Sequence, residues 1–246
     1  MLFLIPIFLF CANNDTIPVG AEKIIKNYPG LVVDYKNNYI FFKDGTSLLY
    51  DDKKEKTKDQ LLNTPDIEDQ FRYDYPLGKL EYSPLNDAGR IRNELFFKKI
   101  YGKSVKEVQK NLVELNWCPK LIGQKILVTK INGVDKAMQL ISLELDELPE
   151  FKDYLINSGG TFNWRRIAGT KRLSMHSFGM TIDLNPKHAN YWQWDCKCTN
   201  EDSILRYKNK IPQKVVDIFE KHGFIWGGKW YHYDTMHFEY RPELLK

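Results

Sequence analysis

The C-terminal half of the chain contains a histidine and an aspartate whose spacing suits metal binding. His176 and Asp183 are seven residues apart, and Gly179 lies between them. The glycine allows the chain to turn sharply, and residues 181–184 favour a strand. We therefore expect His176 and Asp183 to lie at one rim of a sheet and to face the same cleft. A neutral imidazole and a carboxylate are both good ligands for Zn²⁺.

A second polar motif follows later in the chain. A catalytic zinc site needs three protein ligands and one open position for water. His237 begins a short β-favouring run and is the predicted third ligand, and Asp234 precedes it by three residues. That spacing lets one residue bind the metal while the other acts on the water as a general base. We expect one Zn²⁺ per chain, bound by His176, Asp183 and His237, with Asp234 as the base.

Three further polar residues near these motifs are candidates for supporting roles. Ser174 lies two residues before the first ligand and could bond the substrate or the ligand loop; a simple turn hydroxyl is the alternative. Glu239 lies two residues beyond His237, on the same face of a strand. It could orient that histidine, or compete with Asp234 for the role of base. His232 could bond the reacting carbonyl; the alternative is a packed turn rich in aromatic residues.

Together, the motifs S-x-H-x-x-G-x-x-x-D and D-x-x-H-F-E resemble those of the D-alanyl-D-alanine peptidase family of zinc enzymes. That group includes the VanX and VanY peptidases and the phage L-alanyl-D-glutamate endolysins. The resemblance covers about residues 140–241, including 159–165, and does not explain residues 13–100. It implies a small α+β domain with the Hedgehog/D-Ala-D-Ala-peptidase fold. It also implies His176, Asp183 and His237 as the zinc ligands.

The resemblance further implies two catalytic roles. In the dipeptidase and VanY branches the acid/base is usually a glutamate three residues before the last histidine, whereas this chain has Asp234 there and looks like the endolysin branch. Family members also carry an arginine upstream of the first zinc histidine, where it stabilises the tetrahedral oxyanion. Arg165 is our candidate for that role and Arg166 is the runner-up. The alternative for both is a solvated surface pair.

These observations predict hydrolysis of peptide bonds in peptidoglycan stem peptides. The motif letters barely separate a D,D-carboxypeptidase from an L-Ala-D-Glu endopeptidase, although Asp234 makes a D-Ala-D-Ala dipeptidase less compatible. The expected partner is peptidoglycan or its peptide fragments. The alternative from another class is a non-catalytic zinc-containing module that binds the cell wall, which would be favoured if the base were missing.

The surrounding segments show helical patterns. Apolar residues between 134 and 148 recur at intervals of three and four, which predicts an amphipathic helix ended by Pro149. Similar spacing predicts a helix over 211–222, with Gly223 as its C-terminal cap. Another helix is expected from residue 90 to about 102. Ser104 is then expected to cap a helix whose inward face includes Leu112 and Leu115.

Helices and strands mix without a regular strand–helix–strand alternation, so the predicted fold class is α+β. We expect residues 13–100 to form an N-terminal extension that contains strands, and residues 101–246 to form the VanY-like zinc peptidase domain. The predicted strands cover residues 31–34, 39–42, 47–50, 180–184 and 237–240.

Composition and charge exclude some classes. The chain has 246 residues, of which 43% are hydrophobic, so a core can form without cross-links. The net charge of +4 comes from basic and acidic residues that are interspersed along the chain. A nucleic-acid-binding protein would instead cluster its basic residues on one face. We therefore expect no nucleic-acid partner.

Residues 1–12 form an apolar run that is too short to span a membrane as a helix. The run suits an export signal, which predicts a location in the periplasm or cell envelope without a stable membrane span, although no basic residue precedes it. Cys11 is a possible site of lipid attachment. A misassigned start or a buried strand is the alternative.

The other cysteines are Cys118, Cys196 and Cys198. We interpret them as structural or incidental, because one residue between Cys196 and Cys198 is too few for a zinc knuckle. One bridge, for example from Cys118 to either of the others, is possible in an oxidising compartment.

Overall fold

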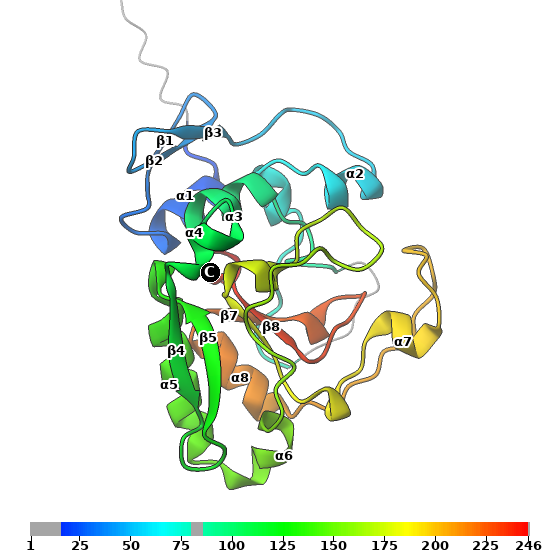
Figure 1. The fold of residues 1–246 in the computed structure, drawn as a ribbon. Coiled ribbons are helices and arrows are strands. Elements are labelled where there is room, and N and C mark those ends of the chain that lie inside the picture. The colour runs from blue at the N-terminus through cyan, green and yellow to red at the C-terminus, as the bar shows by residue number, and fades with distance from the viewer. Residues whose placement is uncertain (1–15, 80–85, 246) are drawn as a thin grey trace, which may run out of the picture.

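The computed structural model describes residues 16–79 and 86–245, within which the strands form three small antiparallel sheets (Figure 1). Helices pack around these sheets, so the α+β class predicted from the sequence is confirmed. The predicted export signal over residues 1–12, and Cys11 within it, lie outside the described residues.

The central sheet determines where the two sequence motifs meet. Its strands are β6 (Thr181–Asp183), β7 (Phe224–Trp226) and β8 (His237–Tyr240), in the order β6-β8-β7. The register pairs Asp183 with His237, so two residues that are distant in sequence are direct neighbours across the strands. The apolar residues between the polar ones, Ile182 and Phe238, are fully buried and also pair with each other.

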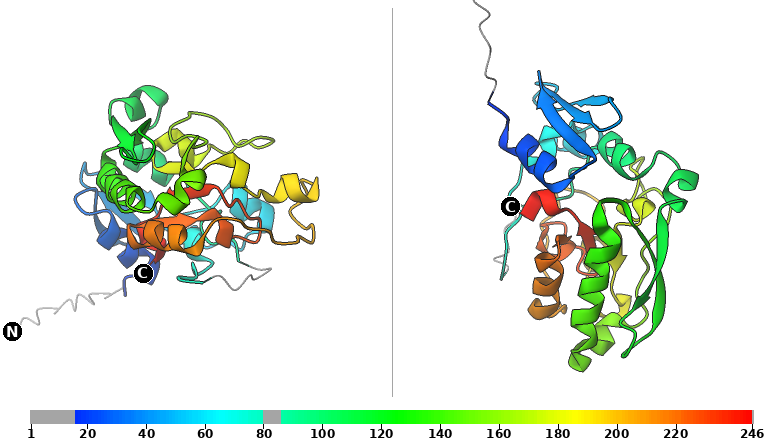
Figure 2. Two further views of the ribbon diagram at one scale, coloured as in Figure 1. Left: turned by 90° about the horizontal axis from the view of Figure 1, so that it is seen from below. Right: turned by 90° about the vertical axis from the view of Figure 1, so that its left-hand side faces the viewer.

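A hairpin and two helices pack together beside this sheet. The hairpin consists of β4 (Leu112–Trp117) and β5 (Gln124–Thr129), and the helices are α5 (Val134–Asp146) and α8 (Gln213–Lys221). Helix α5 contacts both strands of the hairpin and also α8. In the right-hand view of Figure 2, α5 runs alongside the hairpin. The predicted apolar face of α5 is the buried one, with Met138, Ile141 and Leu145 fully enclosed.

The N-terminal extension lies above this region in Figure 1. Its strands β1 (Val32–Lys36), β2 (Tyr39–Phe42) and β3 (Ser47–Leu49) form the meander that the sequence predicts. The extension also contains α1 (Val19–Asn27) and α2 (Lys58–Asn63). Buried residues of this part belong to the same hydrophobic cluster as those of the C-terminal part. The two parts therefore share one core.

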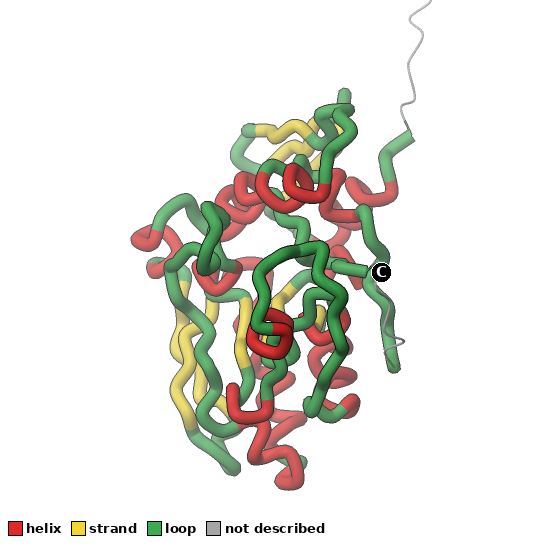
Figure 3. The backbone as a smooth tube through the Cα atoms, turned by 90° about the vertical axis from the view of Figure 1, so that its right-hand side faces the viewer, coloured by secondary structure: helices red, strands yellow, loops and turns green. Residues whose placement is uncertain are grey.

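The remaining helices are short. Helix α9 packs against α1, so the C-terminal end of the chain contacts the extension. The segment between β6 and α8 is mostly loop and contains the short helix α7. It lies on the right-hand side of the molecule in Figure 1, and Figure 3 shows this side facing the viewer. The bounds are α3 (Glu94–Tyr101), α4 (Val105–Gln109), α6 (Lys152–Leu155), α7 (Trp192–Cys196) and α9 (Pro242–Leu245).

Two sequence-based expectations were wrong. Leu112 and Leu115 do not continue a helix from Ser104, because α4 ends at Gln109 and both leucines lie in β4, where pairing with β5 overrides the local helical spacing. The bridge from Cys118, which the sequence analysis named as one possibility, does not form. The disulfide joins Cys196 to Cys198, while Cys118 is a free, buried thiol that packs in the core.

Within the described ranges, none of the helices combines the length and apolar character that crossing a bilayer requires.

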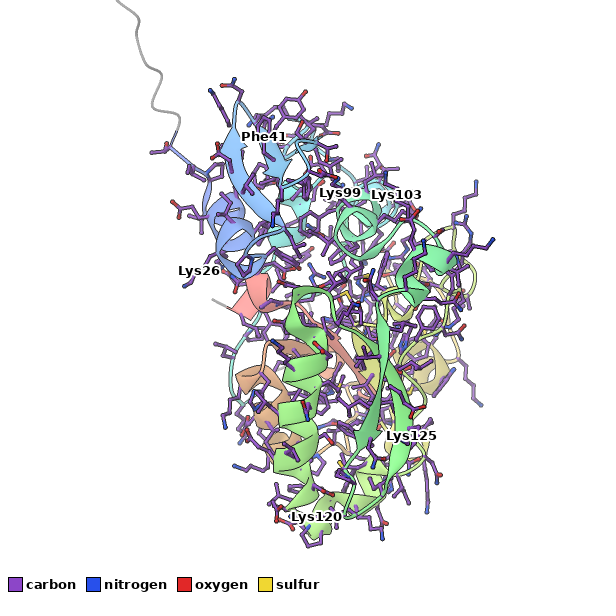
Figure 4. All side chains as sticks on the ribbon, turned by 60° about the vertical axis from the view of Figure 1, so that its left-hand side comes forward. Lys26, Phe41, Lys99, Lys103, Lys120 and Lys125 are labelled. Atoms are coloured by element: carbon purple, nitrogen blue, oxygen red, sulfur yellow. A yellow bond between two sulfur atoms is a disulfide. The ribbon has the colours of Figure 1, made fainter. Side chains whose placement is uncertain are left out.

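The lysines labelled in Figure 4 come from separate parts of the chain. Several of them pair with acidic side chains, as Lys125 does with Glu114 at 2.9 Å. Exposed pairs of this kind contribute little to stability. They distribute the positive charge over the surface.

The shared core leads to a prediction about stability. Ile24 in α1 is fully buried, so Ile24→Ala should lower the free energy of unfolding by about 2–5 kcal/mol. Chemical denaturation should show one cooperative transition for the whole chain. Val19→Ala, on the exposed part of the same helix, is the control and should change stability by less than about 0.5 kcal/mol. Two separate transitions, with only one shifted by Ile24→Ala, would show that the core is not shared.

Candidate metal centre and active site

Three side chains of metal-ligand type converge at one end of the central sheet. His176 lies in a 3-10 turn over Met175–Phe178, Asp183 ends β6, and His237 begins β8. Their ligand atoms all lie within 4.8 Å of one another. The Asp183 carboxylate is 3.1 Å from His176 Nε2 and 2.9 Å from His237 Nδ1. The structure therefore brings together the three residues that the sequence predicts as ligands.

Gly179 makes the turn between His176 and β6 possible. Its φ of 66° is left-handed, a conformation that glycine adopts without strain. A Cβ at this position would lie 2.6 Å from a methyl carbon of Leu112. The Gly179 carbonyl also accepts a hydrogen bond from the Thr129 amide of β5 at 2.9 Å. The turn that carries His176 is thereby fixed against the β4–β5 hairpin.

Contacts on the outer side of each ring orient the two histidines. His176 Nδ1 donates to the Thr161 carbonyl at 2.8 Å, because a carbonyl oxygen can only accept. This leaves His176 Nε2 as the nitrogen that faces Asp183. His237 Nε2 lies 3.1 Å from a Glu239 oxygen. The other ring nitrogen of His237, Nδ1, therefore faces the Asp183 carboxylate. Each outer contact fixes which ring nitrogen points into the site, as is usual for metal-binding histidines.

Glu239 is itself held by two arginines. It is fully buried, and it accepts hydrogen bonds from Arg92 Nη2 at 2.6 Å and Arg241 Nη1 at 2.9 Å. Burial alone would raise the pKa of Glu239, but Arg92, His237 and Arg241 together hold it below its usual range. Glu239 is therefore an ionised acceptor for His237. A carboxylate so fully engaged is poorly placed to act as the general base.

The same charged network reaches the N-terminal extension. Arg241 Nε donates to Glu243, and the Tyr28 hydroxyl at the end of α1 donates to the other Glu243 oxygen at 2.8 Å. Arg92 and Tyr28 both belong to the first hundred residues. The part of the chain that the family resemblance leaves unexplained thus supports the ligand His237.

Asp234 is a half-buried residue whose carboxylate interacts with the charges of the three ligand-type residues and accepts a hydrogen bond from the Met236 main chain. Its Oδ1 has no hydrogen-bond partner among the described residues. Burial, followed by the negative charge of Asp183, raises the pKa of Asp234 to about 7. Its main chain is fixed by the Gly227 carbonyl, which accepts from the Asp234 amide at 3.0 Å. A buried carboxylate oxygen without a partner is costly unless a ligand engages it.

The donor set fits a divalent metal that binds nitrogen and oxygen. Two imidazole nitrogens and one carboxylate face one another, and the unpartnered Asp234 oxygen lies beside them. His237 carries an extra proton without a metal: burial lowers its pKa, but Asp183 and Glu239 raise it to about 10. Metal binding at Nδ1 would displace that proton, and the carboxylate of Asp183 would then contact the metal instead.

Two other acidic groups in the described residues differ from this centre. Both lie in the N-terminal extension, and Lys56 Nζ contacts three of their carboxylates at 2.6–2.9 Å. The lysine supplies the positive charge that a metal would otherwise provide. The groups are Asp51, Asp52 and Asp66, and Asp66, Glu68 and Asp69.

The candidate oxyanion residues lie on an exposed loop. Arg165 Nη1 is 3.5 Å from the Arg166 carbonyl, so its side chain follows the loop. Arg166 reaches the Lys171 carbonyl on the opposite side of the loop. Neither guanidinium has a recorded contact with His176, Asp183 or His237 within the described ranges.

Ser174 and His232 have different surroundings. Ser174 is buried and immediately precedes the turn that carries His176, but its hydroxyl does not cap that turn. His232 is fully engaged elsewhere, because Nδ1 contacts Asp87 at 2.7 Å and Nε2 contacts the Glu201 carbonyl at 3.0 Å. The ring also packs edge-on against Trp192. The structure therefore places His232 in a packed network and not among the ligand-type residues.

The sequence analysis missed Thr161 and Arg92. Thr161 acts through its main-chain carbonyl, so its residue type gives no signal. Arg92 belongs to an Arg90-x-Arg92 pair that the sequence analysis placed at the start of a helix, whereas α3 begins only at Glu94. Two arginines on one side of an extended segment could have indicated a buried acidic partner.

A family model described as D-alanyl-D-alanine carboxypeptidase matches residues 168–240. The matched range contains the three ligand-type residues, Asp234 and Glu239, but not Arg165. The match supports a peptidase that acts on cell-wall peptides, and it agrees with the resemblance in the two motifs. The endolysin-like branch and the Hedgehog-type fold stay predictions. Comparison with curated proteins and comparison with solved structures gave no match.

The contact from Arg92 to Glu239 yields a prediction about metal affinity. Arg92→Gln removes a cation that holds Glu239, so His237 should be less well oriented and zinc affinity should fall by about 10–100-fold. Competition with a chelator of known affinity would measure this change. Arg206→Gln, at an exposed position, is the control. Equal affinity for Arg92→Gln and the unchanged protein, with both folded, would contradict a role for Arg92 in holding the site.

Proposed function

We propose that this chain is a zinc-dependent peptidase that hydrolyses peptide bonds in peptidoglycan stem peptides. The observation that carries the proposal is the convergence of His176, Asp183 and His237 near Asp234, whose buried Oδ1 has no hydrogen-bond partner among the described residues. All four residues lie within the range that the D-alanyl-D-alanine carboxypeptidase family model matches. The proposed cofactor is one Zn²⁺ per chain.

The proposed mechanism assigns a separate task to each group of residues. His176, Asp183 and His237 would hold the zinc, which supplies a Lewis acid and lowers the pKa of water at the site. Asp234 takes a proton from the attacking water and returns it to the leaving amine. Asp234 suits this task because its Oδ1 has no competing partner among the described residues, whereas Glu239 is occupied by two arginines and a histidine.

Charge on the developing oxyanion needs a further donor. Arg165 is the proposed donor, and its guanidinium would have to leave the Arg166 carbonyl and turn toward the metal centre. Ser174, which adjoins the turn of His176, is a proposed contact for the substrate. The bond that is cut, D,D or L-Ala-D-Glu, remains open within this proposal. We also propose export to the periplasm or cell envelope, where such substrates occur.

A non-catalytic wall-binding module is the alternative. The two functions share the metal centre and differ in the need for a base. The Oδ1 atom of Asp234 favours the enzyme, since a binding module gains nothing from a buried carboxylate oxygen without a partner. Digestion of purified peptidoglycan, with mass analysis of the released fragments, decides between them. Release of stem-peptide fragments would also identify the bond, whereas binding without any fragment would support the module.

Metal content tests the cofactor. The purified protein should contain about one zinc ion per chain, and His176→Ala and His237→Ala should both lose it. Elemental analysis after exhaustive dialysis measures this directly. His188→Ala is the control, because the His188 ring packs at a tilt against Tyr154 and His188 is not one of the three ligand-type residues. A folded protein that stays free of metal at neutral pH would contradict the proposal.

Substitution of the base separates catalysis from metal binding. Asp234→Asn should retain zinc and lose about 10²–10⁴-fold in turnover, because the amide cannot accept the proton from water. Hydrolysis of a synthetic stem peptide and metal content are measured on the same sample. Asp202→Asn, whose carboxylate is largely exposed, is the matched control. Unchanged turnover in Asp234→Asn would move the role of base to Glu239.

A further inference from the structure

A short hairpin contains Arg172, which lies four residues before His176 in the chain. Arg166 and Leu173 form an antiparallel bridge. The Ile167 amide donates to the Arg172 carbonyl, and the Ser174 amide donates to the Arg165 carbonyl, both at 2.9 Å. Successive residues of an extended segment point to opposite faces. Arg172 and Ser174 therefore share one face, and Leu173, which packs on the main core, lies on the other.

The charged neighbours of Arg172 surround the metal centre without belonging to it. Burial and the positive charges of Arg90 and Arg92 lower the pKa of Arg172 to about 10, and Glu201 and Tyr191 act in the opposite direction. Arg92 bonds to Glu239, which in turn contacts the ligand His237. Tyr191 pairs through its main chain with Asp234. Arg172 thus interacts electrostatically with residues that adjoin the centre on two sides.

Arg172 differs from the two neighbouring arginines in its partners. Arg90 forms a bidentate pair with Glu201, both contacts at 2.8 Å, and Arg92 pairs with Glu239 at 2.6 Å. Arg172 has no ion pair with an acidic residue of the described ranges, and its Nε is buried without a hydrogen-bond partner. A partly buried guanidinium between two others, without an acid of its own, has a strong preference for an added carboxylate.

We propose that Arg172 binds a free carboxylate of the peptide substrate next to the scissile bond. The proposal rests on the peptidase function proposed above and adds a determinant of specificity to it. Arg172 would bind this carboxylate, whereas Arg165 is the proposed donor to the oxyanion. Two stem-peptide groups have this chemistry: a C-terminal carboxylate, and the α-carboxylate of a γ-linked D-glutamate.

Paired substrates test the contact. The probes are the pentapeptide L-Ala-γ-D-Glu-L-Lys-D-Ala-D-Ala, its C-terminal amide, and the analogue with D-isoglutamine in place of D-glutamate. The unchanged protein should prefer the acid form at one of these positions by about 10-fold or more in kcat/KM. Arg172→Gln should lose that preference, mainly through a higher KM for the acid form, while its rate on the matching amide stays the same. Arg172→Lys should recover part of the preference.

The position of the preferred carboxylate identifies its source. Loss of preference at the C-terminus indicates a carboxypeptidase, and loss at the glutamate indicates an endopeptidase. Lys171→Gln, an adjacent exposed cation, is the control and should keep the preference. Thermal unfolding shows whether Arg172→Gln remains folded. An equal preference for acid over amide in Arg172→Gln and the unchanged protein would overturn the proposal.

Equilibrium binding separates this inference from the proposed function. Asp234→Asn protein is titrated with the acid and amide peptides by calorimetry, with and without Arg172→Gln. If the unchanged protein cuts none of the peptides but binds the acid form through Arg172, the peptidase fails and the carboxylate site stands. If the peptides are cut but acid and amide forms bind equally, the peptidase stands and the carboxylate site fails. Absence of both cutting and binding overturns both.

Discussion

The orientation of His237 in the candidate metal centre depends on its contact with the buried Glu239 carboxylate. Glu239 fixes the outer nitrogen of His237, so the inner nitrogen faces Asp183. An ionised carboxylate without exposure would be strongly unfavourable alone, and Arg92 and Arg241 make it tolerable by donating to both of its oxygens. Removing one member of such a group leaves an uncompensated buried charge, which typically costs about 3–5 kcal/mol.

This dependence explains why the N-terminal extension is joined to the centre. Arg92 precedes α3, and Tyr28 at the end of α1 reaches Glu243. The extension also supplies apolar residues to the common core. Its role in the structure is therefore to complete the support of His237 on the Glu239 side, where Glu239, Arg241 and Glu243 are buried.

Most polar groups around the centre are fully satisfied, which gives meaning to the exceptions. His232, Arg90 and Glu239 have their partners within the protein. Asp234 and Arg172 each retain a buried polar atom without one in the described residues, and so does Arg241 at Nη2. Such atoms lower stability unless a ligand engages them. The first is a carboxylate near the candidate ligands and the second is a cation without an acidic partner, which suits the proposed base and the proposed anchor for an acidic substrate.

The sequence by itself determined the elements and the ligand-type residues near them. Helices α5 and α8 follow from apolar periodicity, and β6 and β8 follow from short β-favouring runs beside His176, Asp183 and His237. These patterns are local, because each depends on the repeat of a single helix or strand. Asp234 was found in the same way, through its spacing from His237.

Tertiary structure decided everything that depends on a distant partner. Leu112 and Leu115 have helical spacing but lie in β4, because β5 offers a full set of main-chain hydrogen bonds. His232 is held by Asp87 and by the Glu201 carbonyl, which lie 145 and 31 positions from it in the chain. Arg92 supports His237 through Glu239, which lies 147 positions from Arg92 in the chain. Pairing between distant charges leaves no periodic trace in a sequence, so only the folded chain could reveal it.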